Sequence, residues 1–291
     1  MSIPKPTQKA IQALKKQYEK LKVGKESLLA MIDETEIPEN VYNSNAIENS
    51  TLSLKETERI LLEMNIARHV SLREIFEAKN LARVIEYTKT KAREQEISRE
   101  LILLLHQMLL GNINDSFAGR FRQKGEYVRV GLHIAPAPEK VEGLIVDLLE
   151  EYASNHEKYF VDRVAKFHLD FETIHPFCDV NGRMGRILMN CQLVRLGFPR
   201  VIIRDKEKKY YYQALREYNI SQKTKPMEKI VALALMESLH KRMTYLKGDK
   251  VITLTEYAKK KKSKGSTLLN AAKRQTIPAF RERGVWKIGG A

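Results

Sequence analysis

Apolar residues recur at spacings of three and four through most of the chain, while strict alternation is confined to short stretches. This pattern predicts a mainly α-helical fold without an internal repeat. The predicted helices cover residues 8–22, 45–64, 71–93, 98–110, 139–153, 161–174, 183–196, 207–219 and 227–245.

The clearest strand signal lies within residues 126–134. The run from Val128 through Arg129 to Val130 meets Gly131 there, and prolines close the stretch. This pattern predicts a small β-hairpin. Because an isolated hairpin is marginally stable in water, we expect it to pack on helices or to act at an edge.

The end of the chain differs from the rest in charge. Residues 250–291 contain eleven Lys or Arg against two Glu, a net of +9 within the whole chain's +15. Thr253 and Glu256 form a capping box that starts a short helix, and a turn at 263–265 leads into a second one. With the basic turn and strand that follow, the order resembles a winged helix-turn-helix of the excisionase type.

Composition narrows the class of protein. The chain has 291 residues, of which 43% are hydrophobic and 30% charged, which is enough to bury a sizeable core in two or three units. Its longest apolar run, 101–110, falls short of the roughly 20 residues of a membrane span. The first residues lack a signal-peptide pattern, so we expect a cytoplasmic protein with no membrane partner. Cys178 and Cys191 fit neither a disulfide framework nor a zinc site.

The densest chemistry lies between His175 and Arg186. This short segment contains one imidazole, one carboxylate, a flexible turn and two guanidinium groups. Pro176 disfavours helical geometry at the residue before it, so the preceding helix should end at His175 and leave the imidazole at the mouth of a loop. A new helix is expected near Arg183.

The start of that helix predicts a phosphate site. Backbone N–H groups of Asn181 and Gly182 can form a concave donor site for phosphate oxygens. Arg183 and Arg186 share a helical face and can add charge-assisted hydrogen bonds to a polyphosphate. A carboxylate so close to phosphate is explained if Asp179 binds a Mg²⁺ ion that bridges phosphate oxygens.

His175 is then left as the general base, and the whole segment resembles a known motif. It matches the Fic motif HPFx(D/E)GNGRxxR at every fixed position except the first glycine, which is Val180 here. A valine restricts a backbone torsion that glycine leaves free. The resemblance implies a protein adenylyltransferase with the helical Fic fold, in which His175 takes the proton from a Ser, Thr or Tyr hydroxyl of a target protein. That hydroxyl attacks the α-phosphate of ATP and expels pyrophosphate.

The resemblance also implies a role for each residue of the loop and helix. Asp179 would hold Mg²⁺, with ATP as the co-substrate. Asn181 and Gly182 would contribute to the anion hole. Arg183 would hold the β-phosphate and Arg186 the γ-phosphate.

A second signature lies far upstream. Ser44 to Asn49, with Glu48 at its centre, resembles the family's inhibitory signature (S/T)xxxE(G/N). In relatives this glutamate pairs with the second motif arginine, here Arg186, because one guanidinium cannot hold a carboxylate and a phosphate in the same place. We therefore expect an N-terminal inhibitory helix that carries Ser44 and Glu48. In some relatives the same glutamate orients a water that reverses the modification, so de-adenylylation stays an alternative.

Two weaker features fit the same family. The predicted hairpin resembles the flap that holds the target as an added strand, with Val128, Arg129 and Val130 as target-binding residues. Tyr212 and Asn219 lie seven residues apart on a predicted helix and match residues that contact adenine in related proteins. Tyr212 fits equally well as a core residue.

These features divide the chain into four parts. They are a helical region with the inhibitory helix at 1–95, a Fic catalytic core at 96–225, a connecting helix at 226–249, and a basic winged helix-turn-helix-like domain at 250–291. The chain itself names no protein target, and a homo-oligomer stays open.

Two alternatives accompany the adenylyltransferase hypothesis. In the first, the chain is a DNA-binding regulator on a Fic scaffold, with Arg274, Arg281, Arg283 and the run 259–262 contacting phosphates. In the second, the fold is kept but the cargo is UMP, phosphate or phosphocholine. The intact motif favours an enzyme, since a pure DNA binder has no use for Asp179 beside a phosphate-binding helix end.

Overall fold

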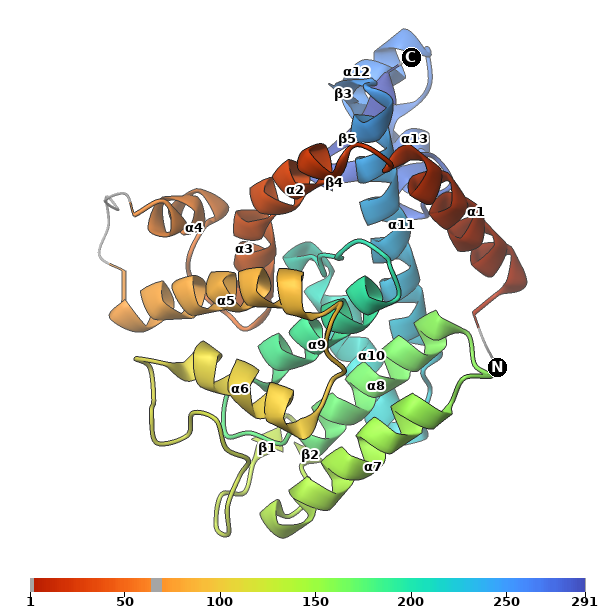
Figure 1. Ribbon diagram of the computed structural model, residues 1–291. Helices are drawn as coiled ribbons and strands as arrows, with labels where there is room; N and C mark the ends of the chain where they lie inside the picture. The colour runs from red at the N-terminus through yellow and green to blue at the C-terminus, as the bar shows by residue number, and fades with distance from the viewer. Residues whose placement is uncertain (1–2, 64–69, 291) are drawn as a thin grey trace.

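The computed structural model describes residues 3–63 and 70–290 and is mainly α-helical, as predicted (Figure 1). Within these residues, no helix combines the length and the apolar character that crossing a membrane requires. The elements in chain order are α1 (Lys5–Leu21), α2 (Glu26–Thr35), α3 (Ile37–Ile47), α4 (Leu54–Leu61), α5 (Leu72–Lys91), α6 (Arg99–Leu110), β1 (Arg129–Val130), β2 (His133–Ile134), η1 (Pro138–Lys140), α7 (Val141–Ser154), α8 (Phe160–Ile174), α9 (Asn181–Arg195), η2 (Asp205–Glu207), α10 (Lys208–Ser221), α11 (Lys225–Lys247), β3 (Lys250–Thr253), α12 (Leu254–Lys260), α13 (Gly265–Lys273), β4 (Ala279–Glu282) and β5 (Val285–Gly290).

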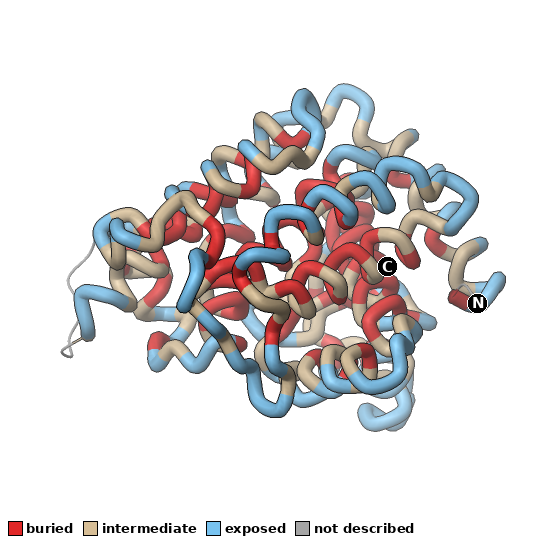
Figure 2. Tube along the Cα trace, turned by 90° about the horizontal axis from the view of Figure 1, so that it is seen from below, coloured by how far each residue is buried: buried red, intermediate tan, exposed pale blue. Residues whose placement is uncertain are grey.

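Helix α9 lies at the centre of the molecule. Twelve of its fifteen residues are buried, so it needs neighbours on every side. Helix α8 packs along it, and α3, α5 and α6 contact it as well. Figure 2 shows the same arrangement as buried segments gathered in the middle of the trace and exposed segments around them.

Two large hydrophobic clusters flank this central helix. One joins α3 to α9 and includes Val41, Leu81, Ile102 and Phe171. The other joins α1 to α8, α10 and α11, where the long helix α11 packs against both α1 and α8. Burial on both sides of α9 holds the start of that helix, and therefore the motif, in a fixed position.

The prediction of one continuous helix over residues 45–64 was wrong. Helix α3 ends at Ile47, and Asn49 takes a left-handed backbone with φ of 69°. Helix α4 begins anew after Ser53, whose side chain accepts a hydrogen bond from the Glu56 N–H while the Glu56 carboxylate accepts one from the Ser53 N–H. This capping box stabilises a helix start and breaks the apparent periodicity. Residue 64, the last of the predicted helix, lies outside the described part of the chain.

The other predicted helices agree with the structure to within a few residues. Helix α9 starts at Asn181, two residues before the predicted start near Arg183 and directly after the left-handed Val180. Helix α2 was not predicted, and neither was strand β3.

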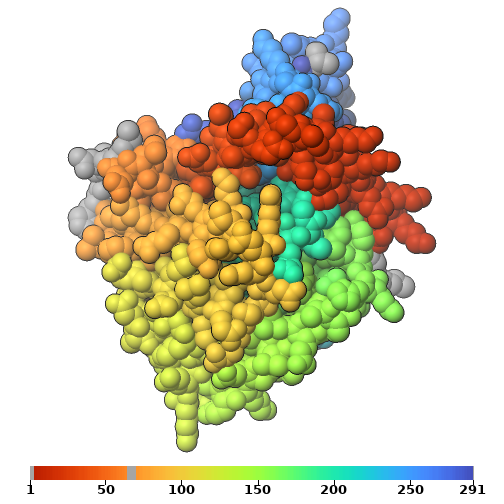
Figure 3. Space-filling model, in the orientation of Figure 1, coloured from red at the N-terminus to blue at the C-terminus, as the bar shows by residue number. Residues whose placement is uncertain are grey.

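The last residues form a small unit at one end of α11, which projects from the molecule in the space-filling view (Figure 3). Its antiparallel sheet has the order β3–β5–β4, and α12 and α13 precede the hairpin of β4 and β5. A small cluster of Ile252, Leu254, Ala272, Ala279 and Ile288 fills it. Its identity as a winged helix-turn-helix domain, and the boundary at residue 250, stay predictions.

A buried charge network attaches this unit to the helices. Glu237 of α11 accepts hydrogen bonds from Arg204 and from Arg281 of β4. Arg204 also forms an ion pair with Glu39 of α3, and the backbone N–H of Gly284 donates to the same carboxylate at 3.1 Å. All four side chains are nearly excluded from solvent, so each charge depends on its partners.

This network corrects part of the DNA-binding alternative. The guanidinium of Arg281 is held by Glu237 and Glu207 and is not free for a phosphate. Arg283 is exposed but forms an ion pair with Glu58 of α4. Arg274 and the lysines of 259–262 are exposed, and DNA binding through them stays a prediction.

Glu237→Ala should lower the free energy of unfolding by about 3–5 kcal/mol, because it leaves two buried guanidinium groups without their carboxylate. Chemical denaturation followed by circular dichroism measures this loss. Glu150→Ala, at an exposed position of α7, is the matched control and should stay within about 0.5 kcal/mol of the parent. A loss at Glu237 no larger than that of the control would show that the network does not hold the unit in place.

Candidate active site

His175 ends helix α8 and opens onto a loop, as the proline after it predicted. Its backbone is left-handed, with φ of 49° and ψ of 61°. Its Nδ1 lies 3.3 Å from the carbonyl oxygen of Glu172, which leaves Nε2 as the nitrogen without that contact. Burial lowers the pKa of His175 to about 4, so the imidazole is neutral at pH 7 and can accept a proton.

The loop after His175 is closed by the side chain of Asn181. Its Oδ1 accepts a hydrogen bond from the N–H of Phe177 at 3.0 Å, and its Nδ2 donates to the carbonyl of Phe177 at 2.8 Å. Phe177 is fully buried and stacks on His106 with ring centroids 3.6 Å apart. The amide of Asn181 therefore shapes the loop, and only the backbone of this residue is available to an anion.

Val180 takes a conformation that its side chain disfavours. Its φ is 62°, in the left-handed region where a β-branched residue is rare and costs about 1–3 kcal/mol. Burial of the side chain in the cluster around α9 offsets this cost. The backbone N–H of Val180 donates to Asp179 Oδ1 at 2.7 Å. The valine thus reaches the backbone region that glycine would adopt freely.

Arg186 joins the two signatures that the sequence singled out. Its Nη2 donates to Glu48 Oε1 at 2.8 Å and to the carbonyl of Ser44 at 2.9 Å. Its Nε donates to Ser44 Oγ at 3.0 Å. The guanidinium is buried, so Ser44 and Glu48 supply the partners that it needs.

The Glu48 carboxylate also rests on the first turn of α9. A Cβ atom added to Gly182 would lie only 2.3 Å from Glu48 Oε1. The first turn of a helix carries unpaired N–H groups and the positive end of the helix dipole, so it favours an anion. Glu48 therefore occupies the place where a phosphate group would be expected.

Helix α10 holds the end of α3 in position. Lys208 Nζ donates to the carbonyl of Ala46 at 3.1 Å, and the Tyr212 hydroxyl donates to the carbonyl of Ile47 at 3.1 Å. These are carbonyls of the last turn of α3, which attract donors and cations. Tyr212 also lies 3.5 Å from Glu48 Oε2. The sequence analysis missed Lys208, although its spacing of four residues from Tyr212 places both on one helical face.

Asn219, two turns further along α10, contacts helix α8. Its Oδ1 accepts a hydrogen bond from Thr173 Oγ1 at 2.7 Å. Thr173 lies two residues before His175, so Asn219 is close in space to the end of α8. It does not contact Tyr212 in any described hydrogen bond.

A second carboxylate lies behind Arg186. Burial and the nearby Glu48 raise the pKa of Glu172 to about 8, so this group is protonated at neutral pH. The Tyr211 hydroxyl lies 3.4 Å from Arg186 Nη1 and 2.7 Å from His168 Nε2. The sequence analysis did not identify this polar cluster, because it forms only where α8, α9 and α10 meet.

An open cavity of about 440 Å³ lies beside His175 and the start of α9. The predicted residues on its wall are Glu48, His175, Asp179, Asn181, Gly182 and Arg183, and those added by the structure include Arg73, Glu74 and Glu77. Arg186, Tyr212 and Asn219 do not line it.

One carboxylate on the cavity wall suits a particular metal. Within the described residues, no group of three or more His, Cys, Asp or Glu is arranged to hold an ion. Mg²⁺ is commonly held by one or two carboxylates together with substrate phosphates. Asp179, beside the first turn of α9, fits that mode.

The predicted hairpin exists and is tied to the end of α8. Strands β1 and β2 pair Arg129 with Ile134 and Val130 with His133, and Val128 extends the pairing through its carbonyl. His133 Nε2 lies 2.8 Å from the carbonyl of Thr173. The apolar side chains of the hairpin are largely exposed.

Arg122 connects the hairpin to the motif, and the sequence analysis gave it no role. Its guanidinium donates to the carbonyls of His175, Ile174, Pro136 and Glu126. One buried side chain therefore fixes the end of α8 relative to both ends of the hairpin segment.

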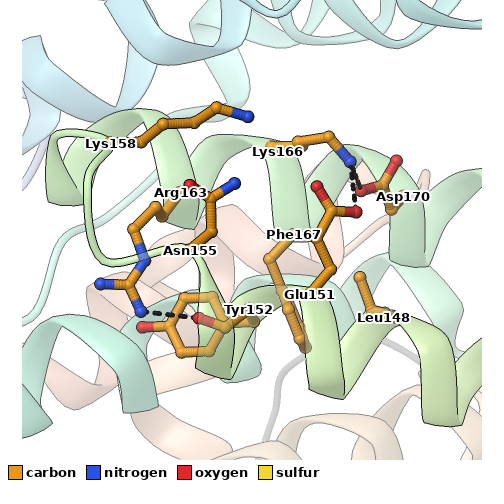
Figure 4. Close-up of a pocket in the computed structure, with 9 residues that line it drawn as sticks. All are labelled: Leu148, Glu151, Tyr152, Asn155, Lys158, Arg163, Lys166, Phe167 and Asp170. Carbon is orange, nitrogen blue, oxygen red and sulfur yellow. Dashed lines mark hydrogen bonds and ion pairs between the residues drawn. The ribbon is translucent and has the colours of Figure 1, made fainter.

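A second surface pocket lies between α7 and α8, and its polar side chains are paired with one another. Figure 4 shows Lys166 between Glu151 and Asp170, and Arg163 directed at the carbonyl of Tyr152. Its volume of about 20 Å³ accommodates about one water. The cavity at the start of α9 is therefore the better candidate for a ligand.

Comparison with known proteins identifies a Fic domain in this chain. Residues 96–193 match the Fic/DOC family. The protein adenylyltransferase Fic of Nematostella vectensis is 32% identical over 185 residues, which are 62% of this chain and 43% of that protein. The enzyme of the same name from Drosophila willistoni is 33% identical over 186 residues, 62% of this chain and 36% of that protein.

Solved structures share the fold. A Fic domain containing signaling protein from Bacteroides thetaiotaomicron superposes with a TM-score of 0.75 at 23% identity, over 83% of this chain and 98% of that one. Fic-1 from C. elegans superposes with a TM-score of 0.71 at 27% identity, over 83% of this chain and 73% of that one.

The helical fold and the site thus define a Fic domain. Residues 96–193 form this domain and match the Fic/DOC family. It spans less than half the length of the curated relatives it matches.

Gly182→Ala should destabilise the protein by about 1–3 kcal/mol, because the added methyl group would collide with Glu48. In a Glu48→Gly background the cost should shrink or reverse, since alanine favours helix more than glycine. A double-mutant cycle by thermal and chemical denaturation measures the coupling, which we expect to be about 1 kcal/mol or more.

Gly143→Ala is the control for this cycle. Gly143 lies within α7, and a Cβ added there meets no atom within 4 Å. Its substitution should stabilise both backgrounds equally, by about 0.5–1 kcal/mol. Equal effects of Gly182→Ala with and without Glu48 would argue against a carboxylate on the first turn of α9.

Proposed function

We propose that this chain is a protein adenylyltransferase that transfers AMP from ATP to a hydroxyl group of a target protein. The observation that carries the proposal is a neutral imidazole, that of His175, on the same cavity wall as the first turn of α9 and Arg183. The relatives named protein adenylyltransferase support the cargo. An enzyme that transfers UMP, phosphate or phosphocholine is the alternative.

His175 is the general base in this proposal. Its Nε2 takes the proton of a Ser, Thr or Tyr hydroxyl as the hydroxyl oxygen bonds to the α-phosphorus of ATP. The bond from that phosphorus to the bridging oxygen breaks, and pyrophosphate leaves with the electron pair. The proton on the imidazole returns to solvent or to the leaving group.

The start of α9 is the phosphate site. Backbone N–H groups of Asn181 and Gly182 bind phosphate oxygens, and Arg183 and Arg186 neutralise their charge. Asp179 would hold Mg²⁺, which would offset the charge of the phosphate groups and of the leaving pyrophosphate. The position of the Asp179 carboxylate on the cavity wall, beside the first turn of α9, supports this assignment.

The hairpin and α10 are proposed to bind the two substrates. Val128, which is partly buried, and the exposed strand residues Arg129 and Val130 offer a strand edge to an extended segment of the target. Tyr212 and Asn219 bind the adenine ring. Their positions beside Glu48 and Thr173 support this role.

Glu48 is proposed to be an inhibitor of its own chain. It holds Arg186 and covers the first turn of α9, so the γ-phosphate cannot bind there while the ion pair persists. Ser44 supports the inhibitory arrangement through two hydrogen bonds from the same arginine.

Glu48→Gly should raise the rate of adenylylation about tenfold to a hundredfold, because a charge-assisted bond of about 1.5–3 kcal/mol no longer competes with phosphate. Intact-protein mass spectrometry after incubation with Mg-ATP measures self-modification as a surrogate for the target. The mass gain also identifies the cargo as AMP or as another group. Glu48→Gly/His175→Ala should show no gain, and an equal gain in that double variant would remove His175 as the base.

The rate should also stay high in mild acid. Burial lowers the pKa of His175 to about 4, so the base is deprotonated over the range where an ordinary histidine, with a pKa of 6.5, becomes protonated. In the Glu48→Gly variant the limit moves no higher, since Glu48 raises this pKa. We expect kcat at saturating Mg-ATP to fall with a midpoint well below pH 6.5. A midpoint at pH 6.5 would contradict a buried base.

A further inference from the structure

The phosphate side of the cavity carries a second set of ion pairs, formed with helix α5. Asp179 Oδ2 pairs with Arg73, and Arg183 Nη1 lies 3.3 Å from Glu77 Oε1. Arg73 Nε donates to Glu77 Oε1 at 3.0 Å, and Arg183 Nη2 lies 3.6 Å from Asp179 Oδ1. The four side chains form a closed ring of alternating charge.

This ring runs from the surface into the site. The side chains of Arg73 and Asp179 are 56% and 37% exposed, whereas those of Glu77 and Arg183 are 13% and 6% exposed. The Arg183 Nε is buried and has no hydrogen-bond partner. Glu77 is therefore the main compensation for a buried guanidinium, and Arg73 forms the movable outer edge of the ring.

The ring repeats the arrangement found at Arg186. Each of the two motif arginines is paired with a carboxylate from a helix outside the motif, Arg186 with Glu48 of α3 and Arg183 with Glu77 of α5. The single carboxylate suited to Mg²⁺, Asp179, is paired with an arginine of that same helix. All the charges that Mg-ATP would use are thus already paired within the chain.

A third residue of α5 links this ring to the segment after Glu48. Glu74 Oε1 accepts hydrogen bonds from Ser50 Oγ at 3.0 Å and from the N–H of Thr51 at 2.7 Å. The backbone N–H of Glu74 also donates to Ser71 Oγ, which caps the start of α5. The first two turns of α5 therefore contact both the inhibitory segment and the metal-binding side of the cavity.

We propose that Arg73 and Glu77 form a second, electrostatic lock on the nucleotide site, distinct from Glu48. This inference rests on the proposed function. Mg²⁺ at Asp179 requires the oxygen that Arg73 now holds, and a phosphate at Arg183 requires a guanidinium that Glu77 now holds. Removal of Glu48 frees Arg186 alone and leaves this second lock in place.

The test uses the full chain in a Glu48→Gly background, which removes the first lock. Isothermal titration calorimetry measures the affinity of a non-hydrolysable ATP analogue at a series of Mg²⁺ concentrations. Arg73→Gln should lower the Mg²⁺ concentration at half-saturation by about two- to fivefold, the size of effect that a partly exposed ion pair allows. Glu77→Gln should tighten binding of the analogue without Mg²⁺ by a similar factor.

Matched controls lie on the same helix. Arg83→Gln and Glu86→Gln change the same residue types at exposed positions of α5 that do not line the cavity, and should change neither quantity. Thermal melting should show that each variant is folded. The Glu77 side chain is largely buried beside Arg183, so its substitution can also disturb packing. Arg73→Gln tests the same lock at an exposed position, where packing is not disturbed.

Three results would overturn the proposal. Unchanged Mg²⁺ dependence in Arg73→Gln would show that Arg73 does not compete with the metal, and weaker binding at saturating Mg²⁺ would make Arg73 a phosphate ligand. Weaker binding in Glu77→Gln would make Glu77 a positioning residue for Arg183. Failure of the Glu48→Gly parent to bind the analogue would instead remove the proposed function, so the two failures are distinguishable.

Discussion

The burial of one guanidinium, that of Arg186, organises the functional half of this protein. A buried positive charge needs partners, and Ser44 and Glu48 provide them from a helix more than a hundred residues away in sequence. The contact fixes the end of α3 over the first turn of α9. Lys208 and Tyr212 then bind the exposed carbonyls of α3, so α10 is held to the same point. The position of the segment that carries Ser44 and Glu48 therefore follows from the partners that one buried arginine requires.

The same requirement recurs throughout a chain with a net charge of +15. Arg242 of α11 is nearly inaccessible and pairs with Glu36, which is beside the start of α3. Arg204 and Arg281 share Glu237 and tie the C-terminal unit to α3 through Glu39. Buried ion pairs contribute less to net stability than hydrophobic burial does. They favour one particular pairing of helices, because any other pairing would leave a buried charge without a partner. They place the N-terminal helices, the motif and the tail in one arrangement.

Charge pairing also satisfies the positive charge at the start of α9. The start of α9 combines a helix dipole with two arginines, a concentration of positive charge that favours an anion. Carboxylates from α3 and α5 meet that need within the chain. In the proposed function, a nucleotide competes with these side chains for the same groups, so its affinity would depend on how firmly α3 and α5 hold their carboxylates in place.

Much of the fold and of the site could be predicted from short stretches of the sequence. The helical periodicity, the stop at His175 imposed by Pro176, and the signatures around Glu48 and Arg186 are written in short stretches of sequence, because they depend on neighbouring residues. The break after Ile47 was missed because Asn49 can continue a helix or leave it, and only the packing of α4 decides which.

Tertiary structure alone decided which charges meet. No spacing in the sequence links Arg73 to Asp179, Glu77 to Arg183, or Arg122 to the carbonyl of His175. These contacts join helices that are distant in the chain, and each depends on the way the apolar faces around α9 pack. The sequence by itself determined the chemical groups and the local turns that present them. The packed core determined their partners, because a buried charge takes whichever counter-charge the surrounding helices bring within reach.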